Sequence, residues 1–462
     1  MLDKLIASEV LEKALSSGGT FAEIFFEDTL TNSLVMRNDT VETVSSGRKH
    51  GAGVRLFCGT RCLYAYTNDT SRSGLLDCAA KVAAAAQCAE KAAVETLTQR
   101  HFSDMNPAER LPADVEHHKR LAIMRDCNRV MREVSSEIVQ AQSSWGDVDQ
   151  RVWIANSEGL FVHDRRIRTR LSMMAVASDG KENQIGFEGP GAMRGFELFE
   201  RKIDAPERAK IAANTALTML HAPNCPAGVM PVVMAGGFGG VVFHEACGHS
   251  LEATSVARGQ SEFCGKLGQQ IASPIVTAID DGTIPFSWGS TNIDDEGAPT
   301  TKLVLIENGV LKNYMIDKLG GLRMGMPSTG SGRRQDYTFA PTSRMRNTYI
   351  AAGNDDDAEM IATMGDGLYA AKMGGGSVNP ATGEFNFAVS EGYLVKDGKI
   401  AHPVRGASLI GRGGEVLMKI DRVGRDCSRA QGVCGSLSGS VPTDVGQPHI
   451  RISSMTVGGR DA

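Results

Sequence analysis

Two histidines and a glutamate lie close together after an apolar, glycine-rich run, and their spacing is unusual. His244, Glu245 and His249 form the pattern HExxxH, whereas the common zinc-binding helix has HExxH, with histidines four residues apart. Each residue of an α-helix turns about 100°, so residues five apart diverge by roughly 140°. The two rings can share a metal ion only if the helix ends or widens between them, as in a single π-turn. We expect Gly248 to permit this distortion.

The residue types in this stretch suit a metal site. Neutral imidazoles bind zinc, and a neighbouring carboxylate can act as general base on water. A buried helix that carries two histidines by chance is the alternative. A zinc site also needs a third protein ligand, and spacing leaves that choice open. The candidates are Glu252, which could instead orient an imidazole, Cys434 in a glycine-rich loop, the acids Asp294, Asp295 and Glu296, and the remaining histidines.

The composition argues against several classes of function. The chain has 462 residues and a formal net charge of −5, which disfavours a nucleic-acid-binding surface. No run of 18 or more apolar residues occurs, so we expect no transmembrane helix and no membrane partner. The first residues lack the pattern of a secretory signal. Ten cysteines without a CxxC pair indicate reduced thiols of a cytoplasmic protein instead of a disulfide framework.

The hydrophobic periodicity predicts an α+β fold. Apolar residues at helical spacing predict helices over 3–15, 71–93, 114–134 and 205–220. Short alternating segments between turn signals predict antiparallel strands, among them 32–37, 40–44 and 53–57 and a meander over 136–193.

Two breaks in the pattern predict the domain organisation. Residues 1–222 are expected to form an N-terminal α/β sandwich-like region with antiparallel sheets, with a further subdivision near 97–112. Residues 223–462 are expected to form a mainly antiparallel β domain that carries the HExxxH helix.

Three further stretches have residue types that suit a binding site. The acids of 292–297 precede a glycine and form either a charged turn or an acidic wall beside the site. Arg333 and Arg334 follow a Gly-Ser-Gly loop and could bind a substrate carboxylate or stabilise an oxyanion, with a solvated loop as the alternative. Gly374 and Gly375 could line a cleft beside a peptide backbone, or form a tight turn.

Several motifs in a fixed order resemble one known family. They are HEACGHSLE, NIDDEGAP, LVLIENGVLKNYMIDK, STGSGRR, GGGSVNPATGEFNF and VCG with VPTDVGQP, from about Met230 to the last residues. FAEIFFED and HGAGVRLF, nearer the N-terminus, are a weaker match. Together these motifs resemble the TldD/PmbA family, also called the modulator of DNA gyrase family, and within it the TldD-type zinc metallopeptidases.

The resemblance implies one zinc ion per chain, bound by His244, His249 and Cys434, with Glu245 as general base. It implies a peptidase that hydrolyses peptide bonds in flexible or unfolded peptides and proteins. It also implies a dimer, with a second copy or with a TldE/PmbA-like homologue that lacks the HExxxH residues. Cys247 departs from the motif of the relatives.

Two rival functions follow from the same residues. An amidase acting on small molecules would need a deep, closed pocket. A non-catalytic assembly or regulatory protein with structural zinc would need four protein ligands.

Overall fold

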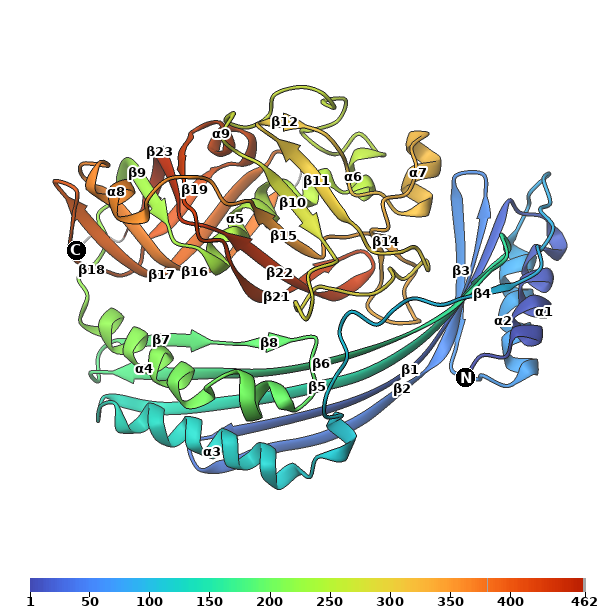
Figure 1. Ribbon diagram of the computed structural model, residues 1–462, viewed down its shortest axis with the longest axis horizontal. Coiled ribbons are helices and arrows are strands. Elements are labelled where there is room, and N and C mark those ends of the chain that lie inside the picture. Colours follow the sequence, from blue (N-terminus) through green and yellow to red (C-terminus); the bar gives the residue numbers. More distant parts are fainter. Residues whose placement is uncertain (380, 460–462) are drawn as a thin grey trace.

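The N-terminal half forms one long sheet of eight strands (Figure 1). The computed structural model describes residues 1–379 and 381–459. The strands are β1 Phe21–Arg37, β2 Thr40–Cys58, β3 Arg61–Thr67, β4 Thr98–Arg100, β5 Ile138–Asn156, β6 Leu160–Ser178, β7 Asn183–Glu188 and β8 Gly191–Ala192. They pair in the order β3-β2-β1-β5-β6-β4, and β7 and β8 also pair with β6. Only the β4–β6 pair is parallel within the described part of this sheet.

Four of these strands are longer than the sequence predicts. β1 has 17 residues, and β2, β5 and β6 have 19 each. The middle of β1 is polar, yet Leu30 pairs with Arg48 of β2 and with Asp149 of β5. Backbone pairing on both sides continues the strand where the apolar alternation fails. The prediction of several short strands in this half was therefore wrong.

Helices cover the two ends of the sheet separately (Figure 1). They are α1 Lys4–Ala14 and α2 Arg72–Ala85 at one end, and α3 His117–Glu133 and α4 Ala205–His221 at the other. Asp3 caps α1 by accepting from the backbone N–H groups of Leu5 and Ile6. Each pair buries its own cluster, and β1 contributes to both, through Ile24 at one end and Leu34 at the other. Within the described ranges, no helix is long and apolar enough to cross a bilayer.

The C-terminal half contains a small closed barrel and a second sheet. The barrel strands are β9 Gly228–Met234, β16 Gly367–Asn379, β17 Glu384–Lys396, β19 Ser408–Arg412 and β23 Ile450–Gly458, with β18 Lys399–Val404 and β20 Ile420–Val423 paired at the sides. They pair in the order β16-β9-β23-β19-β17, and β17 pairs back to β16, which closes the ring. The β9–β16 pair is parallel and the other pairs are antiparallel.

The second sheet has six strands and lies beside the barrel (Figure 1). They are β10 Ala278–Asp281, β11 Lys302–Glu307, β12 Val310–Leu311, β15 Asn347–Ile350, β21 Ser428–Ser436 and β22 Gly439–Gln447, in the order β12-β11-β10-β15-β22-β21. Other elements of this half, besides the helical segment around α5 Val241–Phe243, are β13 Gly332–Arg333, β14 Thr342–Ser343, α6 Ala253–Val256, α7 Lys318–Met324, α8 Asp357–Ala362 and α9 Gly413–Met418. The predicted α+β fold is confirmed, with one parallel pair in the barrel and one in the six-stranded sheet.

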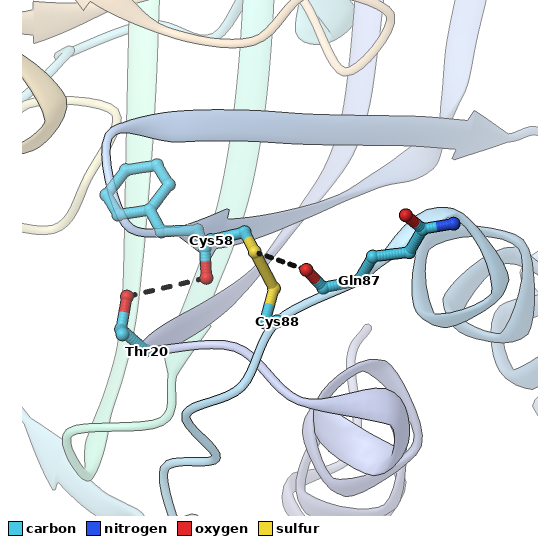
Figure 2. Close-up of a disulfide and its surroundings, with 5 residues drawn as sticks. Thr20, Cys58, Gln87 and Cys88 are labelled. Carbon is cyan, nitrogen blue, oxygen red and sulfur yellow. Dashed lines mark hydrogen bonds between the residues drawn. A yellow bond between two sulfur atoms is a disulfide. The ribbon is translucent and has the colours of Figure 1, made fainter.

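One disulfide joins the end of β2 to the segment after α2 (Figure 2). It links Cys58 to Cys88, whose Cα atoms are 5.6 Å apart. The prediction that all ten cysteines are reduced was therefore wrong for this pair. Their separation of 30 residues matches no recognisable motif. The two cysteines meet because the chain returns along α2 to the end of β2. The other eight cysteines are free thiols.

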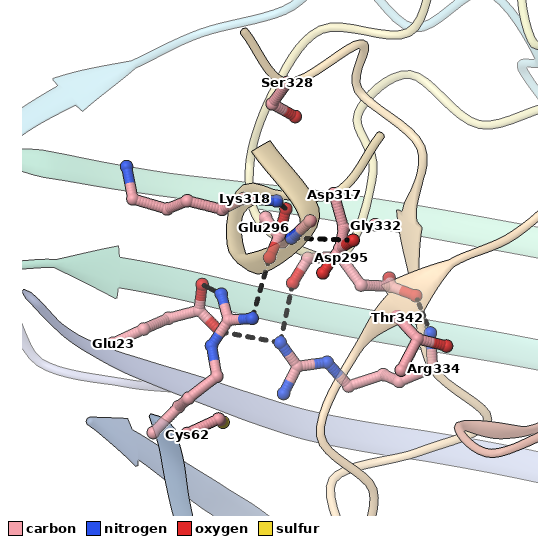
Figure 3. A network of polar contacts seen from close by, with 12 residues as sticks. Glu23, Cys62, Asp295, Glu296, Asp317, Lys318, Ser328, Gly332, Arg334 and Thr342 are labelled. Atoms are coloured by element: carbon pink, nitrogen blue, oxygen red, sulfur yellow. Dashed lines mark hydrogen bonds and ion pairs between the residues drawn. The ribbon is translucent and has the colours of Figure 1, made fainter. Parts of the chain in front are cut away.

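A buried ionic network joins the N-terminal sheet to the C-terminal half (Figure 3). Arg55 of β2 lies 2.7 Å from Glu23 of β1 and 2.7 Å from Glu296. Arg334 donates to the other oxygen of Glu23 at 2.6 Å, and its backbone N–H donates to Asp295 at 2.8 Å. Each arginine therefore bridges the two halves, and the carboxylates are compensated although they are shielded from water.

Replacing Arg55 by methionine tests this network. The change leaves Glu23 and Glu296 short of a buried counter-charge, so we expect the free energy of unfolding to fall by about 3–5 kcal/mol. Urea unfolding followed by circular dichroism measures it. Arg72→Met is the matched control, since Arg72 and Glu9 form an exposed ion pair, and little change is expected. Equal decreases in the free energy of unfolding of the two variants would show that the burial of the Arg55 ion pairs is unimportant.

Candidate metal centre

The helix that carries the histidines is widened where the spacing predicts. The helical turn α5 Val241–Phe243 continues as a π-turn over His244–Gly248 and then as a 3-10 turn over His249–Leu251. The His249 N–H donates to the His244 carbonyl, five residues earlier. The extra residue is absorbed in this way, and the two ring centroids lie 5.3 Å apart. The predicted distortion is confirmed.

Gly248 is required for a different reason from the predicted one. Its backbone angles, φ −55° and ψ −53°, are ordinary helical values that any residue adopts. A Cβ atom at this position would instead lie 2.2 Å from the Met345 sulfur. The missing side chain therefore lets Met345 pack directly against the π-turn.

Cys434, from strand β21, lies between the two imidazoles. Its sulfur is 3.3 Å from Nε2 of His244 and 3.3 Å from Nε2 of His249. The three potential ligand atoms all lie within 4.8 Å of one another. Donors that share one tetrahedral zinc ion at about 2.0–2.3 Å are roughly 3.5 Å apart. Two imidazole nitrogens and a thiolate therefore fit zinc both in chemistry and in spacing.

Two glutamates flank the imidazoles in different ways. Glu252 is buried, and its Oε2 lies 3.2 Å from Nδ1 of His249. It accepts a hydrogen bond there and so directs Nε2 of His249 towards Cys434. Glu245 has a side chain that is 31% exposed, and its Oε2 lies 3.7 Å from Nε2 of His249. Glu252 thus orients an imidazole, while Glu245 lies on the side that water can reach.

The pKa values of Cys434 and His249 are both strongly shifted by their surroundings. Burial raises the pKa of the Cys434 thiol, but the imidazoles of His244 and His249 outweigh it and bring this pKa to about 3. Burial lowers the pKa of His249, yet Glu252 and Cys434 raise it well above the usual value. In the metal-free protein the sulfur is therefore already a thiolate, which is the form that binds metal ions.

Cys247 is inside the motif but points away from this centre. Its side chain is buried and lines an apolar cavity with Phe243, Phe385 and Ile450. Burial, together with the charge of Glu262, raises the pKa of its thiol well above the ordinary value. The thiol is therefore protonated and shielded, in contrast to that of Cys434.

The other candidate residues lie outside the cluster. Arg333 donates to the carbonyl oxygens of Met345 and Pro442, and Arg334 donates to Glu23. Both guanidinium groups are buried and already engaged, so we assign neither to a substrate carboxylate or an oxyanion.

The acids expected as a charged turn or an acidic wall are also buried in the protein. Asp294 accepts backbone N–H groups of its own loop, Asp295 pairs with Arg166, and Glu296 pairs with Arg55.

Gly374 and Gly375 lie within β16 and not in a tight turn. The register of β16 against β17 shifts between Met373 and Gly376, so the two glycines form a bulge. A part for them in binding a substrate stays a prediction. Arg344 and Met345 do contact the centre, at Cys434 and Gly248, but nothing in an Arg-Met pair marks them in the sequence.

The ionisation of Cys434 can be followed directly. A thiol with a pKa of about 3 stays ionised throughout the neutral range, whereas an ordinary thiol is protonated below its pKa of about 8.5. We expect the difference in ultraviolet thiolate absorption between the metal-free protein and its Cys434→Ser variant to stay constant from about pH 8 to about pH 5. A difference that disappears over this range would show an ordinary thiol.

Substituting alanine for Gly248 tests the packing of the π-turn. The new Cβ must displace Met345 or the turn, so we expect a loss of about 1–3 kcal/mol in the free energy of unfolding, with weaker metal binding. Urea unfolding and a metal titration measure the two effects. The control is Gly146→Ala in β5, where a Cβ would meet nothing within 4 Å. If both variants behave like the wild type, the contact with Met345 is unimportant.

Comparisons with known proteins agree with this architecture. Family models described as PmbA/TldA metallopeptidase match residues 22–86 as domain 1, 110–220 as the central domain and 227–459 as the C-terminal domain. The metalloprotease TldD homolog of Haemophilus influenzae is 36% identical over 450 residues, which cover 95% of this chain and 93% of that protein. The zinc metalloprotease TldD homolog of Saccharolobus solfataricus is 25% identical over 468 residues, or 97% and 99% of the two chains.

A solved structure has the same fold at low sequence identity. TldE from Thermococcus kodakarensis is 18% identical and superposes with a TM-score of 0.79 over 98% of this chain and 100% of its own. The family that the sequence motifs predict is confirmed. The chain belongs to the PmbA/TldD metallopeptidase family.

Proposed function

We propose that the chain is a zinc-dependent peptidase with one zinc site. The observation that carries this proposal is the convergence of His244, His249 and Cys434 within 4.8 Å, with Glu245 at their exposed side. Three protein ligands leave a coordination position for water, as catalytic zinc sites do. The relative from Saccharolobus solfataricus is itself named a zinc metalloprotease, which supports the choice of metal.

Each neighbouring residue has a task in peptide hydrolysis. When bound, a zinc ion supplies Lewis acidity and makes water acidic near neutral pH. Glu245 accepts the proton of the attacking water on a carboxylate oxygen and passes it to the amine that leaves. Glu252 holds His249 in the tautomer whose Nε2 faces the centre. His244 and Cys434 are buried, which keeps bulk water away from the side of the site where these two ligands lie.

The surroundings of Cys434 favour flexible or unfolded peptides as substrates. β21 is the last strand in the order of its sheet, and an extended peptide can pair with such a strand. Val433 and Leu437, on either side of Cys434, are 62% and 64% exposed. An open, apolar surface of this kind suits a chain segment better than the small, enclosed substrate of an amidase.

The alternative of a structural zinc protein is less well supported. Such a site closes its coordination with four protein ligands, whereas the cluster in the described residues has three. We infer from the family a dimer with a second copy or with a TldE/PmbA-like homologue. Its cytoplasmic location stays a prediction, as does the division of the chain at residue 223 into an N-terminal region and a metallopeptidase domain.

The function is tested with Glu245→Gln, which keeps the shape of the side chain but not the base. The purified protein, with and without a TldE-like homologue, is incubated with an unfolded polypeptide, and new amino termini are counted. We expect the cleavage rate to fall by about 10²–10⁴-fold, because general-base catalysis is lost. The zinc content, measured in parallel, should not change.

The control is Glu158→Gln, an exposed glutamate paired with Lys318, which should cleave like the wild type. Equal cleavage by Glu245→Gln would remove Glu245 from the mechanism. Zinc retention without cleavage by any form would favour the structural alternative.

A further inference from the structure

One buried side chain contacts the strand that carries Cys434 at two places. Arg344 lies between β14 and β15 and is fully buried. Its Nη2 donates to the carbonyl oxygen of Cys434 itself. Its Nη1 donates to Oγ of Ser438 at 3.0 Å and to the carbonyl oxygen of Gly439 at 2.7 Å, at the turn between β21 and β22. The guanidinium thus spans the whole end of this hairpin.

The same guanidinium faces the carboxylate that orients His249. Nε of Arg344 lies 4.0 Å from Oε1 of Glu252. Both atoms are buried and have no hydrogen-bond partner among the described residues, while the other oxygen of Glu252 contacts Nδ1 of His249. A buried carboxylate needs a compensating charge, and Arg344 is in position to supply it.

These contacts matter because the two ligands come from distant parts of the chain. Cys434 and His249 are 185 residues apart, and the hairpin that presents Cys434 is exposed at Val433 and Leu437. A metal site tolerates displacements of only about 0.5 Å before its geometry is lost. The next residue, Met345, packs against Gly248 of the π-turn. Residues 344 and 345 therefore contact both sides of the centre.

We propose that Arg344 is a positioning residue for the metal site. It fixes the thiolate of Cys434 through the backbone of the hairpin and the imidazole of His249 through Glu252, and so sets the separation of these two ligands. The proposal rests on the proposed function, since it concerns ligands of the same zinc site. Its test therefore measures metal binding and not only hydrolysis.

The experiment compares zinc affinity, by competition with a chelator, for the wild type and Arg344→Met. We expect affinity to fall by about 10–100-fold, as it does when groups that orient metal ligands are removed. Cobalt is the second probe: the thiolate-to-cobalt absorption band should weaken or shift as Cys434 moves from the metal. Arg344→Lys keeps a charge near Glu252 but cannot reach all three acceptors, so its affinity should fall by less.

The matched control is Arg120→Met, which removes another buried arginine, 2.9 Å from Asp147 in the N-terminal sheet. It should lose thermal stability and keep the zinc affinity and cobalt spectrum of the wild type. Wild-type affinity and spectrum in Arg344→Met would overturn the proposal. If that variant does not fold, unchanged affinity in Arg344→Lys would overturn it equally. A wild-type protein that binds neither ion would refute the proposed function itself.

Discussion

The contact of one sulfur atom with two imidazoles is the interaction around which the candidate metal site is built. It requires a π-turn, so that His244 and His249 face the same point, and a hairpin that brings Cys434 back to them. The π-turn contacts both the barrel and the six-stranded sheet, and the hairpin belongs to that sheet. Residues 344 and 345 contact the hairpin and the π-turn respectively. The candidate metal site is therefore a property of tertiary packing, although two of its members are close in sequence.

The pairing of His244 with His249 can be predicted from the sequence pattern, whereas the third ligand, Cys434, cannot. If His244 and His249 share a metal ion, the five-residue step between them requires the helix to widen or end. No local pattern makes Cys434 a better third ligand than Glu252, because its position follows from the pairing of β21 with β22. Only the resemblance to a family distinguished the two. Gly248 was correctly singled out but for the wrong reason, since its neighbour Met345 is 97 positions away in the chain.

Several charged residues lie in surroundings that the sequence does not reveal. Arg333 and Arg334 follow a Gly-Ser-Gly stretch, which is typical of a solvated or substrate-binding position. In the structure Arg334 is buried against Glu23, 311 residues earlier. The sequence shows which residues are charged but not which are buried. Arg334 is buried because its loop lies against the N-terminal sheet at Glu23. The length of β1 escaped prediction for a related reason, since its polar middle section is stabilised by backbone pairing with β2 on one side and β5 on the other.

The length of β1 has a consequence for how the N-terminal half comes apart. This single strand supplies Ile24 to one hydrophobic cluster and Leu34 to the other, and its hydrogen bonds to β2 and β5 run without interruption between them. If one cluster loosens, the β1 backbone beside it loses its hydrogen bonds to β2 and β5. The same row of hydrogen bonds continues into the other cluster. A ladder of hydrogen bonds shared by two cores couples the opening of one to the opening of the other. We therefore expect this half of the molecule to unfold as one cooperative unit, although its two groups of helices cover separate clusters.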